Sequence, residues 1–498
     1  MSLITRTLRL PRTVHSPAWR SSISATKVFP LSPRLSTGVC APMEGFPAPR
    51  LLSTLIAHTQ RPTWRTGLLP GRLVAAVPGL NSSAAFTTQA TAPSTAESTG
   101  SHQSHSQSQG PSSEPPSRKA VGYWLLASAA SVFGIVVWGG VTRLTESGLS
   151  IVEWNLIRGM KPPRTEAEWQ EEFEKYKQFP EYKKLNQDMT LEEFKFIFFM
   201  EWGHRIWGRL IGATFLLPAA FFHYKGWLTS PVKKRVWFIA GLICFQGVLG
   251  WYMVKSGLDH ALMDTPGAVP RVSPYRLAAH LGSAFLIYTG MVYTGLGVFR
   301  ENNLARPGRL TQFGNLVNSP VLNRLRHSAH GLTMLVFFTA ISGAFVAGLD
   351  AGLLYDTFPL MGDRLIPPKD ELWDPRFSGK DMTSPQGSSS QVVTSNSGMW
   401  KNIFENPTTV QFNHRMLGVT TFTATTLIYL YARRLPLPRS VRITLNTLMS
   451  LAVLQVTLGI STLLCSVPTE LAASHQAGSL SLLTATLTLM HLLKRVPK

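Results

Sequence analysis

The chain has 498 residues, 44% of them hydrophobic, and combines a formal net charge of +21 with a positive mean hydropathy. A soluble protein rarely combines such a high positive charge with a positive mean hydropathy, and membrane burial is therefore the first hypothesis to test. The basic residues are not gathered in one patch, as a nucleic-acid-binding surface would require, and we expect no nucleic-acid partner.

Residues 1–80 are rich in Arg and Ser and nearly free of acids. Between Met1 and Arg72 there are ten basic residues and a single acid, Glu44. This composition is typical of a mitochondrial transit region, and a disordered basic tail is the alternative. Residues 81–118 are mostly Ser, Thr, Gln and Pro, which cannot bury enough apolar surface to fold, and they are predicted to be a disordered linker.

Beyond residue 118, apolar stretches close to the roughly 20 residues that cross a bilayer recur between shorter polar breaks. Helices are expected because lipid offers no partner to an unpaired backbone group, and the alternation of a membrane barrel is missing. The eight predicted spans are 121–141, 194–224, 236–254, 277–299, 329–349, 411–432, 441–464 and 471–493.

Loop charge predicts the orientation of these spans. Basic residues cluster at both ends of the span region and after the second, fourth and sixth spans, whereas loops 142–193 and 350–405 carry many acids. By the positive-inside rule, both termini face the matrix and the two long loops face the intermembrane space. The expected location is the mitochondrial inner membrane, as a multi-pass protein surrounded by membrane lipid.

The two halves of the span region repeat each other. Because the corresponding spans run in the same direction, the repeat is parallel, although the eighth span needs one extra residue on each side of its histidine to match the fourth. The matching segments are Glu201-x-x-His204-Arg205-x-x-Gly208 with Gln411-x-x-His414-Arg415-x-x-Gly418, and Leu277-Ala-Ala-His280-Leu-Gly-Ser283 with Leu471-Ala-Ala-Ser-His475-Gln-Ala-Gly-Ser479.

The predicted fold class is therefore an all-α polytopic membrane protein, with eight transmembrane helices arranged as two pseudo-symmetric four-helix bundles. Residues 119–300 would form the N-terminal bundle and residues 327–498 the C-terminal bundle. A matrix linker, residues 301–326, would join the two.

Four histidines lie near the starts of spans that all run from the intermembrane space to the matrix: His204, His280, His414 and His475. They should therefore lie at a similar depth near the outer face. Each pair comes from alternate helices of one half, so two imidazoles can approach one iron from opposite sides. A lone membrane histidine is more often a helix-to-helix hydrogen-bonding group, but four at matched positions favour ligands.

Zinc is a rival metal for these histidines. No carboxylate or thiolate completes a tetrahedral set within either half, so haem iron fits the pattern better. The chain has only three cysteines and no C-x-x-C-H attachment motif, and any haem must be held noncovalently.

One position breaks the symmetry of the repeat. Glu201 precedes His204 by three residues and shares its helix face, whereas the matching residue in the second half is the uncharged Gln411. A carboxylate can exchange protons beside one iron, and an amide cannot act as an acid or base. The alternative is that Glu201 only favours the positive end of its helix dipole. Arg205 and Arg415 could pair with haem propionates or anchor the helices at the interface.

These segments closely resemble the haem A synthase family, mitochondrial branch. The resemblance runs from about residue 121 to the C-terminus and is carried by several long motifs in the same order. They are Gly139-Gly-Val-Thr-Arg-Leu-Thr-Glu-Ser-Gly-Leu-Ser150, Glu201-Trp-Gly-His-Arg-Ile-Trp-Gly-Arg-Leu-Ile-Gly212, Pro270-Arg-Val-Ser273, Tyr275-Arg-Leu-Ala-Ala-His-Leu-Gly-Ser283, Ala347-Gly-Leu-Asp-Ala-Gly-Leu353, Gln411-Phe-Asn-His-Arg-Met-Leu-Gly418 and residues 455–481.

The resemblance implies an oxidoreductase that converts the C8 methyl group of haem O to a formyl group, giving haem A for cytochrome c oxidase. It implies that His414 and His475 ligate a resident haem b, while His204 and His280 address the iron of the substrate haem. Glu201 matches the family's functional carboxylate and is the expected catalytic residue. The implied partners are ferredoxin with its reductase as electron donor and haem O synthase, a farnesyltransferase, for delivery; a homo-oligomer is left open.

The chain departs from the family in one respect. Bacterial relatives often have a cysteine pair in the first outer loop, and residues 142–193 contain none, which puts a route for reducing equivalents through such a pair in doubt. Two other functions remain as alternatives. One is a bis-histidine di-haem membrane cytochrome that only transfers electrons, and the other is a haem transport or assembly scaffold without turnover.

Overall fold

The computed structural model describes residues 115–155, 161–264, 269–306, 318–378 and 396–495. The predicted transit region and nearly all of the predicted linker lie outside these residues. The end of that linker is packed: Ser117 is buried, and its hydroxyl donates to Thr229 Oγ1 at 3.1 Å and accepts from Thr229 N at 2.8 Å. The packed part of the chain therefore begins at or before Ser117.

Long helices occupy all eight ranges that were predicted from hydropathy, and the residues described here contain no β-strand. Most extend a few residues beyond the prediction. α4, for example, starts at Leu191 because Thr190 and Glu193 form a capping box there. The eight helices are α1 (Lys119–Leu144), α4 (Leu191–Tyr224), α5 (Ser230–Gly257), α7 (Pro274–Leu304), α9 (Leu322–Gly348), α12 (Pro407–Arg433), α13 (Arg439–Leu464) and α14 (Thr469–Leu492).

Six of these helices are long and apolar enough to cross a membrane, and α12 and α14, with 27 and 24 residues, are not among them. Both are rich in threonine. Their hydroxyls bond back to carbonyls one turn earlier, as Thr425 Oγ1 does to Thr421 O at 2.7 Å and Thr484 Oγ1 to Leu480 O at 2.7 Å. Hydropathy scales treat these hydroxyls as polar, although within the helix they are already hydrogen-bonded.

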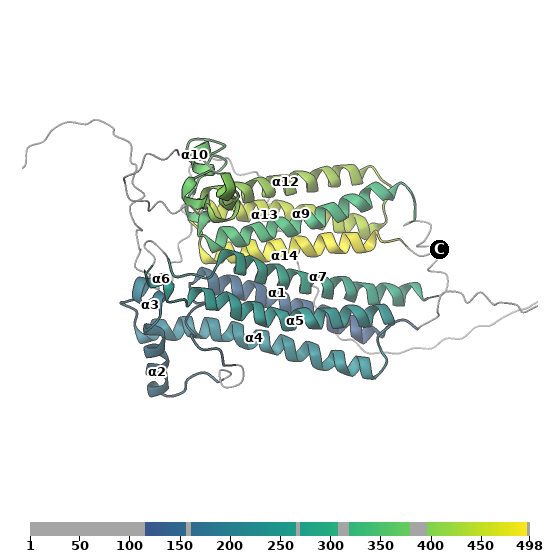
Figure 1. The fold of residues 1–498 in the computed structure, drawn as a ribbon. Helices are drawn as coiled ribbons and strands as arrows, with labels where there is room; N and C mark the ends of the chain where they lie inside the picture. Colours follow the sequence, from purple (N-terminus) through teal and green to yellow (C-terminus); the bar gives the residue numbers. More distant parts are fainter. Residues whose placement is uncertain (1–114, 156–160, 265–268, 307–317, 379–395, 496–498) are drawn as a thin grey trace, which may run out of the picture. The chain divides into compact units, whose positions relative to one another are not determined.

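The long helices pack in the same order within each half of the chain. In the N-terminal half, α1 and α5 each contact both α4 and α7. In the C-terminal half, α9 and α13 each contact both α12 and α14. The histidine-bearing helices therefore alternate with the others around each half, and the two halves meet where α7 packs on α9 and α14 packs on α1 and α7 (Figure 1).

Short helices gather at one end of the long ones, opposite the C-terminus (Figure 1). In the first loop, α2 (Glu166–Lys177) and α3 (Pro180–Leu185) cover the extended start of α4. Trp169, Phe173 and Tyr176 are buried there against Phe194 and Phe198. The first long loop thus has a small apolar core of its own, packed on the start of α4.

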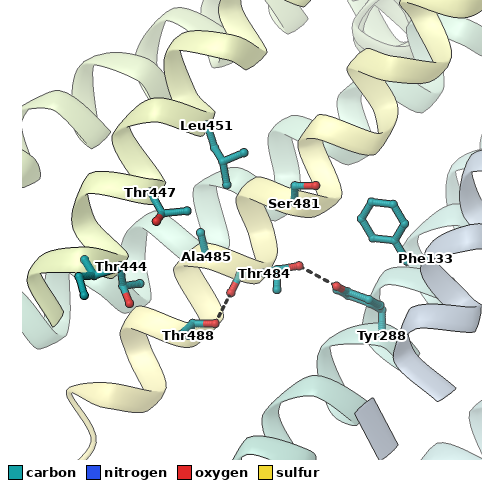
Figure 2. Close-up of a pocket in the computed structure, with 10 residues that line it drawn as sticks. Phe133, Tyr288, Thr444, Thr447, Leu451, Ser481, Thr484, Ala485 and Thr488 are labelled. Atoms are coloured by element: carbon teal, nitrogen blue, oxygen red, sulfur yellow. Dashed lines mark hydrogen bonds between the residues drawn. The ribbon is translucent and has the colours of Figure 1, made fainter. Parts of the chain in front are cut away.

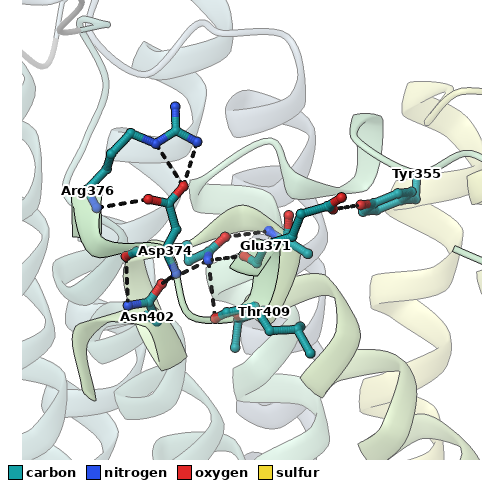
Figure 3. A network of polar contacts seen from close by, with 9 residues as sticks. Tyr355, Glu371, Asp374, Arg376, Asn402 and Thr409 are labelled. Atoms are coloured by element: carbon teal, nitrogen blue, oxygen red, sulfur yellow. Dashed lines mark hydrogen bonds and ion pairs between the residues drawn. The ribbon is translucent and has the colours of Figure 1, made fainter. Parts of the chain in front are cut away.

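The second long loop contains short helical turns, which are η2 (Ala351–Leu353), α10 (Lys369–Leu372), η3 (Pro375–Ser378), η4 (Asn396–Lys401) and α11 (Asn402–Glu405). A polar network holds them to the start of α12 (Figure 3). The buried Asn402 accepts from Asp374 N at 3.0 Å, and Thr409 donates to Leu372 O at 2.6 Å.

Between the halves, the helical parts of the chain reach further than predicted. α7 continues to Leu304 and α9 begins at Leu322, so the predicted linker 301–326 is helical at both of its ends. Residues 307–317 of that linker lie outside the described part of the chain.

Candidate functional site

Each of the four predicted histidines packs against a glycine of a neighbouring helix. A Cβ atom added at Gly343 would lie 3.2 Å from Cε1 of His414, and one at Gly459 would lie 2.8 Å from Cε1 of His475. In the N-terminal half, a Cβ at Gly250 would lie 3.1 Å from Cε1 of His280. At Gly139 the nearest atom is Nε2 of His204, at 2.9 Å. Glycine at these positions lets the neighbouring helix approach each imidazole closely, and a side chain there would press on the ring.

A second matched contact holds the backbone at one histidine of each half. Gln246 Nε2 donates to His280 O at 2.9 Å, and Gln455 Nε2 donates to His475 O at 2.8 Å. Both glutamines lie one turn before the glycine that faces the same histidine. The repeat noted in the sequence therefore extends to the surroundings of the histidines, and it aligns α7 with α14 directly on His280 and His475, with no inserted residue.

The C-terminal pair of histidines lies close together, with nearly perpendicular ring planes. The ring centres of His414 and His475 are 6.5 Å apart, with an angle of 87° between the ring planes. Two imidazoles bound to one metal from opposite sides, with bonds of about 2 Å each, have ring centres on the order of 6 Å apart. His414 is also oriented, because its Nδ1 lies 2.7 Å from Ser342 Oγ. This pair therefore fits a single metal ion between the rings.

The N-terminal pair is arranged differently. No ring pairing comparable to that of His414 and His475 is found between His204 and His280, both of which the structure describes. His204 turns Nε2 toward Gly139, and it lies about two turns further from the start of its helix than the other three histidines do.

Glu201 is buried, with 3% of its surface exposed, and both oxygens of its carboxylate accept hydrogen bonds. Oε1 accepts from Arg205 Nε at 3.0 Å and Nη2 at 2.6 Å. Oε2 accepts from Ser150 Oγ and from Ile151 N, both at 2.8 Å. Glu201 thus fixes the turn after α1 and the guanidinium of Arg205 beside His204.

The helix-dipole alternative for Glu201 is wrong. Glu201 lies about three turns after Leu191, the first residue of α4, and the favourable effect of a helix N-terminus falls off within the first turn.

The corresponding residues of the C-terminal half make different contacts. Gln411 Nε2 donates to Tyr355 O at 2.9 Å, and Arg415 donates to Tyr355 O at 3.0 Å and to Leu360 O at 3.1 Å. Arg205 likewise donates to Ile151 O at 2.8 Å. Both arginines therefore anchor an outer loop by its carbonyls, but only Arg205 has a carboxylate beside it.

A group of charged residues joins the halves at the loop end. Asp350, directly after α9, accepts from Arg143 of α1 at 2.8 Å and lies 2.9 Å from Arg271 of the segment before α7. Asp350 has a left-handed backbone with φ of 52°, and so does Glu146, at 51°. Each follows its histidine-facing glycine by seven residues, so both helices end in the same strained turn.

None of the four histidines lines the cavity shown in Figure 2. It has a volume of about 380 Å³ and is lined by residues of α13 and α14 together with Phe133 and Tyr288. The Tyr288 and Thr484 hydroxyls are 2.7 Å apart and join α7 to α14 there. Within the described residues, no group of three or more His, Cys, Asp or Glu side chains is placed to hold a metal ion.

Sequence reasoning missed several residues that build this site. The spacing Gln-x-x-x-Gly occurs in both α5 and α13 and was a readable signal for Gln246 and Gln455. Asp350 and Ser342 gave no such signal. Their contacts to Arg143 and to His414 come from the packing of helices far apart in the sequence.

A protein-family model described as COX15-CtaA, cytochrome oxidase assembly protein, matches residues 122–487. The chain is 52% identical to the haem A synthase COX15 of Bos taurus over 384 residues, which are 77% of this chain and 84% of the relative. It is 44% identical to the haem A synthase COX15 of Saccharomyces cerevisiae over 380 residues, 76% of each. A haem A synthase-mitochondrial ferredoxin fusion protein of Schizosaccharomyces pombe is 46% identical over 381 residues, 75% of this chain and 60% of the relative.

These matches confirm the resemblance drawn from the sequence motifs and the oxidoreductase function that it implied. They span the region that contains all four histidines and Glu201. The chain belongs to the COX15-CtaA family of cytochrome oxidase assembly proteins.

Proposed function

We propose that this protein makes haem A by oxidising the C8 methyl group of haem O to a formyl group, with a different task for each half of the chain. The observation that carries the proposal is the spacing of His414 and His475, whose ring centres are 6.5 Å apart. That spacing suits two axial ligands of one iron, in a chain whose relatives are named haem A synthases.

The C-terminal half would hold a resident haem b. His414 and His475 are its proposed axial ligands. Ser342 Oγ, 2.7 Å from Nδ1 of His414, fixes that ring, and Gln455 fixes the backbone at His475. A fixed outer partner makes a ligating histidine hold its metal more tightly. When bound, haem b supplies an iron that carries one electron at a time.

The N-terminal half would bind haem O as the substrate. His204 and His280 are the proposed contacts to its iron, and the Nε2 of His204 lies toward Gly139 of α1. Such a site suits a ligand that enters and leaves. Glu201 is the proposed catalytic residue of this half. Its link to Ser150 Oγ at 2.8 Å gives a proton a path between the carboxylate and the outer turn.

The proposed fold in the membrane is eight spans in two pseudo-symmetric four-helix bundles. The equal packing order of α1, α4, α5 and α7 and of α9, α12, α13 and α14 supports this arrangement. The satisfied threonine hydroxyls support membrane burial of α12 and α14. The protein is proposed to lie in the mitochondrial inner membrane. The distribution of loop charge would place both termini in the matrix and the histidines toward the intermembrane space.

A ferredoxin is the proposed electron donor. One relative is a single chain in which a haem A synthase is fused to a mitochondrial ferredoxin. Fusion raises the effective concentration of one component beside the other, which is an advantage when the two act together. The basic loops on the proposed matrix side would suit an acidic donor.

The proposal is tested by supplying haem O, ferredoxin and its reductase to membranes that contain the wild type or Glu201→Gln. Extracted pigments are then separated and haem A is quantified. We expect haem A from the wild type and at least about 100-fold less from Glu201→Gln, because an amide cannot exchange a proton. Equal haem A from both would remove Glu201 from the catalytic machinery.

Glu192→Gln is the matched control, because Glu192 lies on the same helix with an exposed side chain and should give wild-type amounts of haem A. The same preparations separate the two alternatives. A cytochrome that only transfers electrons would retain two haems and convert neither. A scaffold without turnover would release haem unchanged whether or not reductant is present.

A further inference from the structure

The repeat fails at the residue that follows each histidine of α7 and α14. Counted from the aligned histidines, Leu281 in α7 corresponds to Gln476 in α14. Leu281 packs beside the apolar core, whereas Gln476 reaches out of its own half. Its Nε2 donates to Val136 O of α1, in the other half, at 3.1 Å. A polar side chain thus crosses the contact between the halves directly beside His475.

Gly140 is the reason that Gln476 fits there. A Cβ atom at Gly140 would overlap the side-chain oxygen of Gln476. Without a side chain at 140, the carbonyl of Val136 one turn earlier stays open to a donor from the neighbouring helix. The pairing of Gly140 in α1 with Gln476 in α14 is therefore specific. A larger residue at 140 or a shorter one at 476 would break the hydrogen bond to Val136 O.

The two ends of this contact lie beside the two proposed iron sites. Gln476 follows His475 in the chain, and Gly139, which precedes Gly140, faces the ring of His204, because a Cβ atom added at Gly139 would lie 2.9 Å from Nε2 of His204. The hydrogen bond from Gln476 to Val136 and this close approach of α1 to His204 therefore link the surroundings of a histidine in each half. Electron transfer through protein is faster along bonded and closely packed atoms than across gaps.

We propose that Gln476, seated on Gly140 and bonded to Val136 O, is a positioning residue that couples the two halves for electron transfer. The inference rests on the proposed function, because it needs a haem in each half. In the step concerned, the iron between His414 and His475 loses one electron and the iron at His204 and His280 gains it. No atom or proton moves with that electron.

The test uses the full-length protein in lipid nanodiscs, with haem b in one half and haem A bound as product in the other. The formyl group of haem A is conjugated with the macrocycle and shifts its absorption to longer wavelength, so the two irons can be followed separately after light-triggered reduction. Gln476→Leu introduces the residue that α7 has at the matching position. We expect electron transfer between the haems to slow by about tenfold, with both haems retained and their spectra unchanged.

Tyr288→Phe is the matched control. It removes another hydrogen bond that crosses between the halves, from Tyr288 to Thr484, but one that lies further along α14 and away from the histidines. The transfer rate should stay at the wild-type value. If Tyr288→Phe slows the transfer as much as Gln476→Leu does, general docking of the halves explains the effect and the proposal is wrong. A wild-type rate in Gln476→Leu also overturns it.

A double-mutant cycle with Gly140→Ala adds an independent measurement and replaces Gln476→Leu should that variant not fold. Gly140→Ala should slow the transfer in the wild-type background, because its methyl group displaces Gln476. In a Gln476→Ala background the same methyl group should have no further effect. Additive effects in the two backgrounds would contradict the pairing. A wild type that fails to hold two haems would instead contradict the proposed function.

Discussion

The two halves of the molecule share one scaffold and differ in what surrounds the histidines. Each half has a glycine facing every histidine and a glutamine donating to the backbone at one of them. In the C-terminal half, the rings of His414 and His475 already lie at the spacing of two ligands of one iron. In the N-terminal half, His204 faces Gly139, and the acid that the other half lacks, Glu201, is joined to an outer turn.

The difference between the two histidine pairs suits one half to keeping a bound haem and the other to reacting with one. A histidine pair that is held in place before binding loses little freedom when a metal binds, so it favours tight and lasting occupancy. A pair of histidines whose rings are not paired before binding, as with His204 and His280, is better suited to a haem that is exchanged after each reaction. Under the proposed function, the half without a carboxylate would keep the resident haem, and the half with one would carry out the oxidation.

The largest expected effect comes from removing one histidine of each half in turn. His414→Ala should lose the resident haem from the purified protein and produce no haem A, because its iron loses an axial ligand. His204→Ala should keep that haem at the wild-type stoichiometry while also producing no haem A. The measurement is the haem content and absorption spectrum of protein purified without added haem O.

A milder variant sharpens the same comparison. Ser342→Ala removes the partner of His414 Nδ1 and should weaken haem b binding by about 10- to 100-fold without abolishing it. Equal loss of the resident haem in His204→Ala and His414→Ala would show that the halves are not specialised.

The sequence was sufficient to predict the long helices and the repeat. Apolar length identifies a helix without knowledge of its neighbours, and the motifs around His204 and His414 could be compared directly. The extended start of α4 was also readable, because Thr190 and Glu193 have the spacing of a capping box. Hydropathy was less informative for α12 and α14, where threonine hydroxyls are satisfied within the helix.

The partners of the candidate site residues could not be predicted. Glu201 accepts from Ser150 and Ile151 because the chain turns back after α1 through a left-handed residue at Glu146. The contact of Gln476 with Val136 depends on how the two halves dock. Both arise from tertiary packing between segments far apart in the sequence, which one sequence read alone does not encode in any local pattern.

The outer loops of the two halves should respond to pH in opposite directions. In the first loop, the pKa of Glu181 is raised from 4.5 to about 8, mainly by burial; the hydrogen bond from Tyr176 and the charge of Arg143 oppose the rise, and the nearby Glu201 and Glu146 add to it. A carboxyl with a raised pKa contributes stability that is complete below pH 4.5 and is lost as pH rises through about 8. The change should amount to a few kcal/mol for a group buried this deeply.

Proteolysis of the first loop at pH 5, 7 and 9 measures this effect. Cleavage should rise with pH in the wild type. Glu181→Gln should remove most of the rise, because the amide stays neutral and can still accept from the Tyr176 hydroxyl, as Glu181 does at 3.1 Å. A pH dependence that is the same in both proteins would assign the effect to another group.

The smallest expected effect is in the second outer loop, where the sign is reversed. Arg376 lowers the pKa of Asp374 by donating to its carboxylate from the side chain and the backbone (Figure 3). A carboxyl with a lowered pKa contributes stability above its unfolded value of 3.8 and loses it as pH falls. The Arg376 side chain is 58% exposed, so the loss should be at most about 1 kcal/mol.

Amide hydrogen exchange from Leu372 to Arg376, measured between pH 3 and 6 and corrected for the intrinsic exchange rate, should show protection decreasing toward low pH. Asp374→Asn should give the low-pH protection at every pH. Arg376→Gln is the matched variant, because it removes the cation and keeps the carboxyl, and it should shift the loss of protection to higher pH. If both loops became less stable in the same pH direction, the titration of Glu181 and Asp374 could not explain their pH dependence.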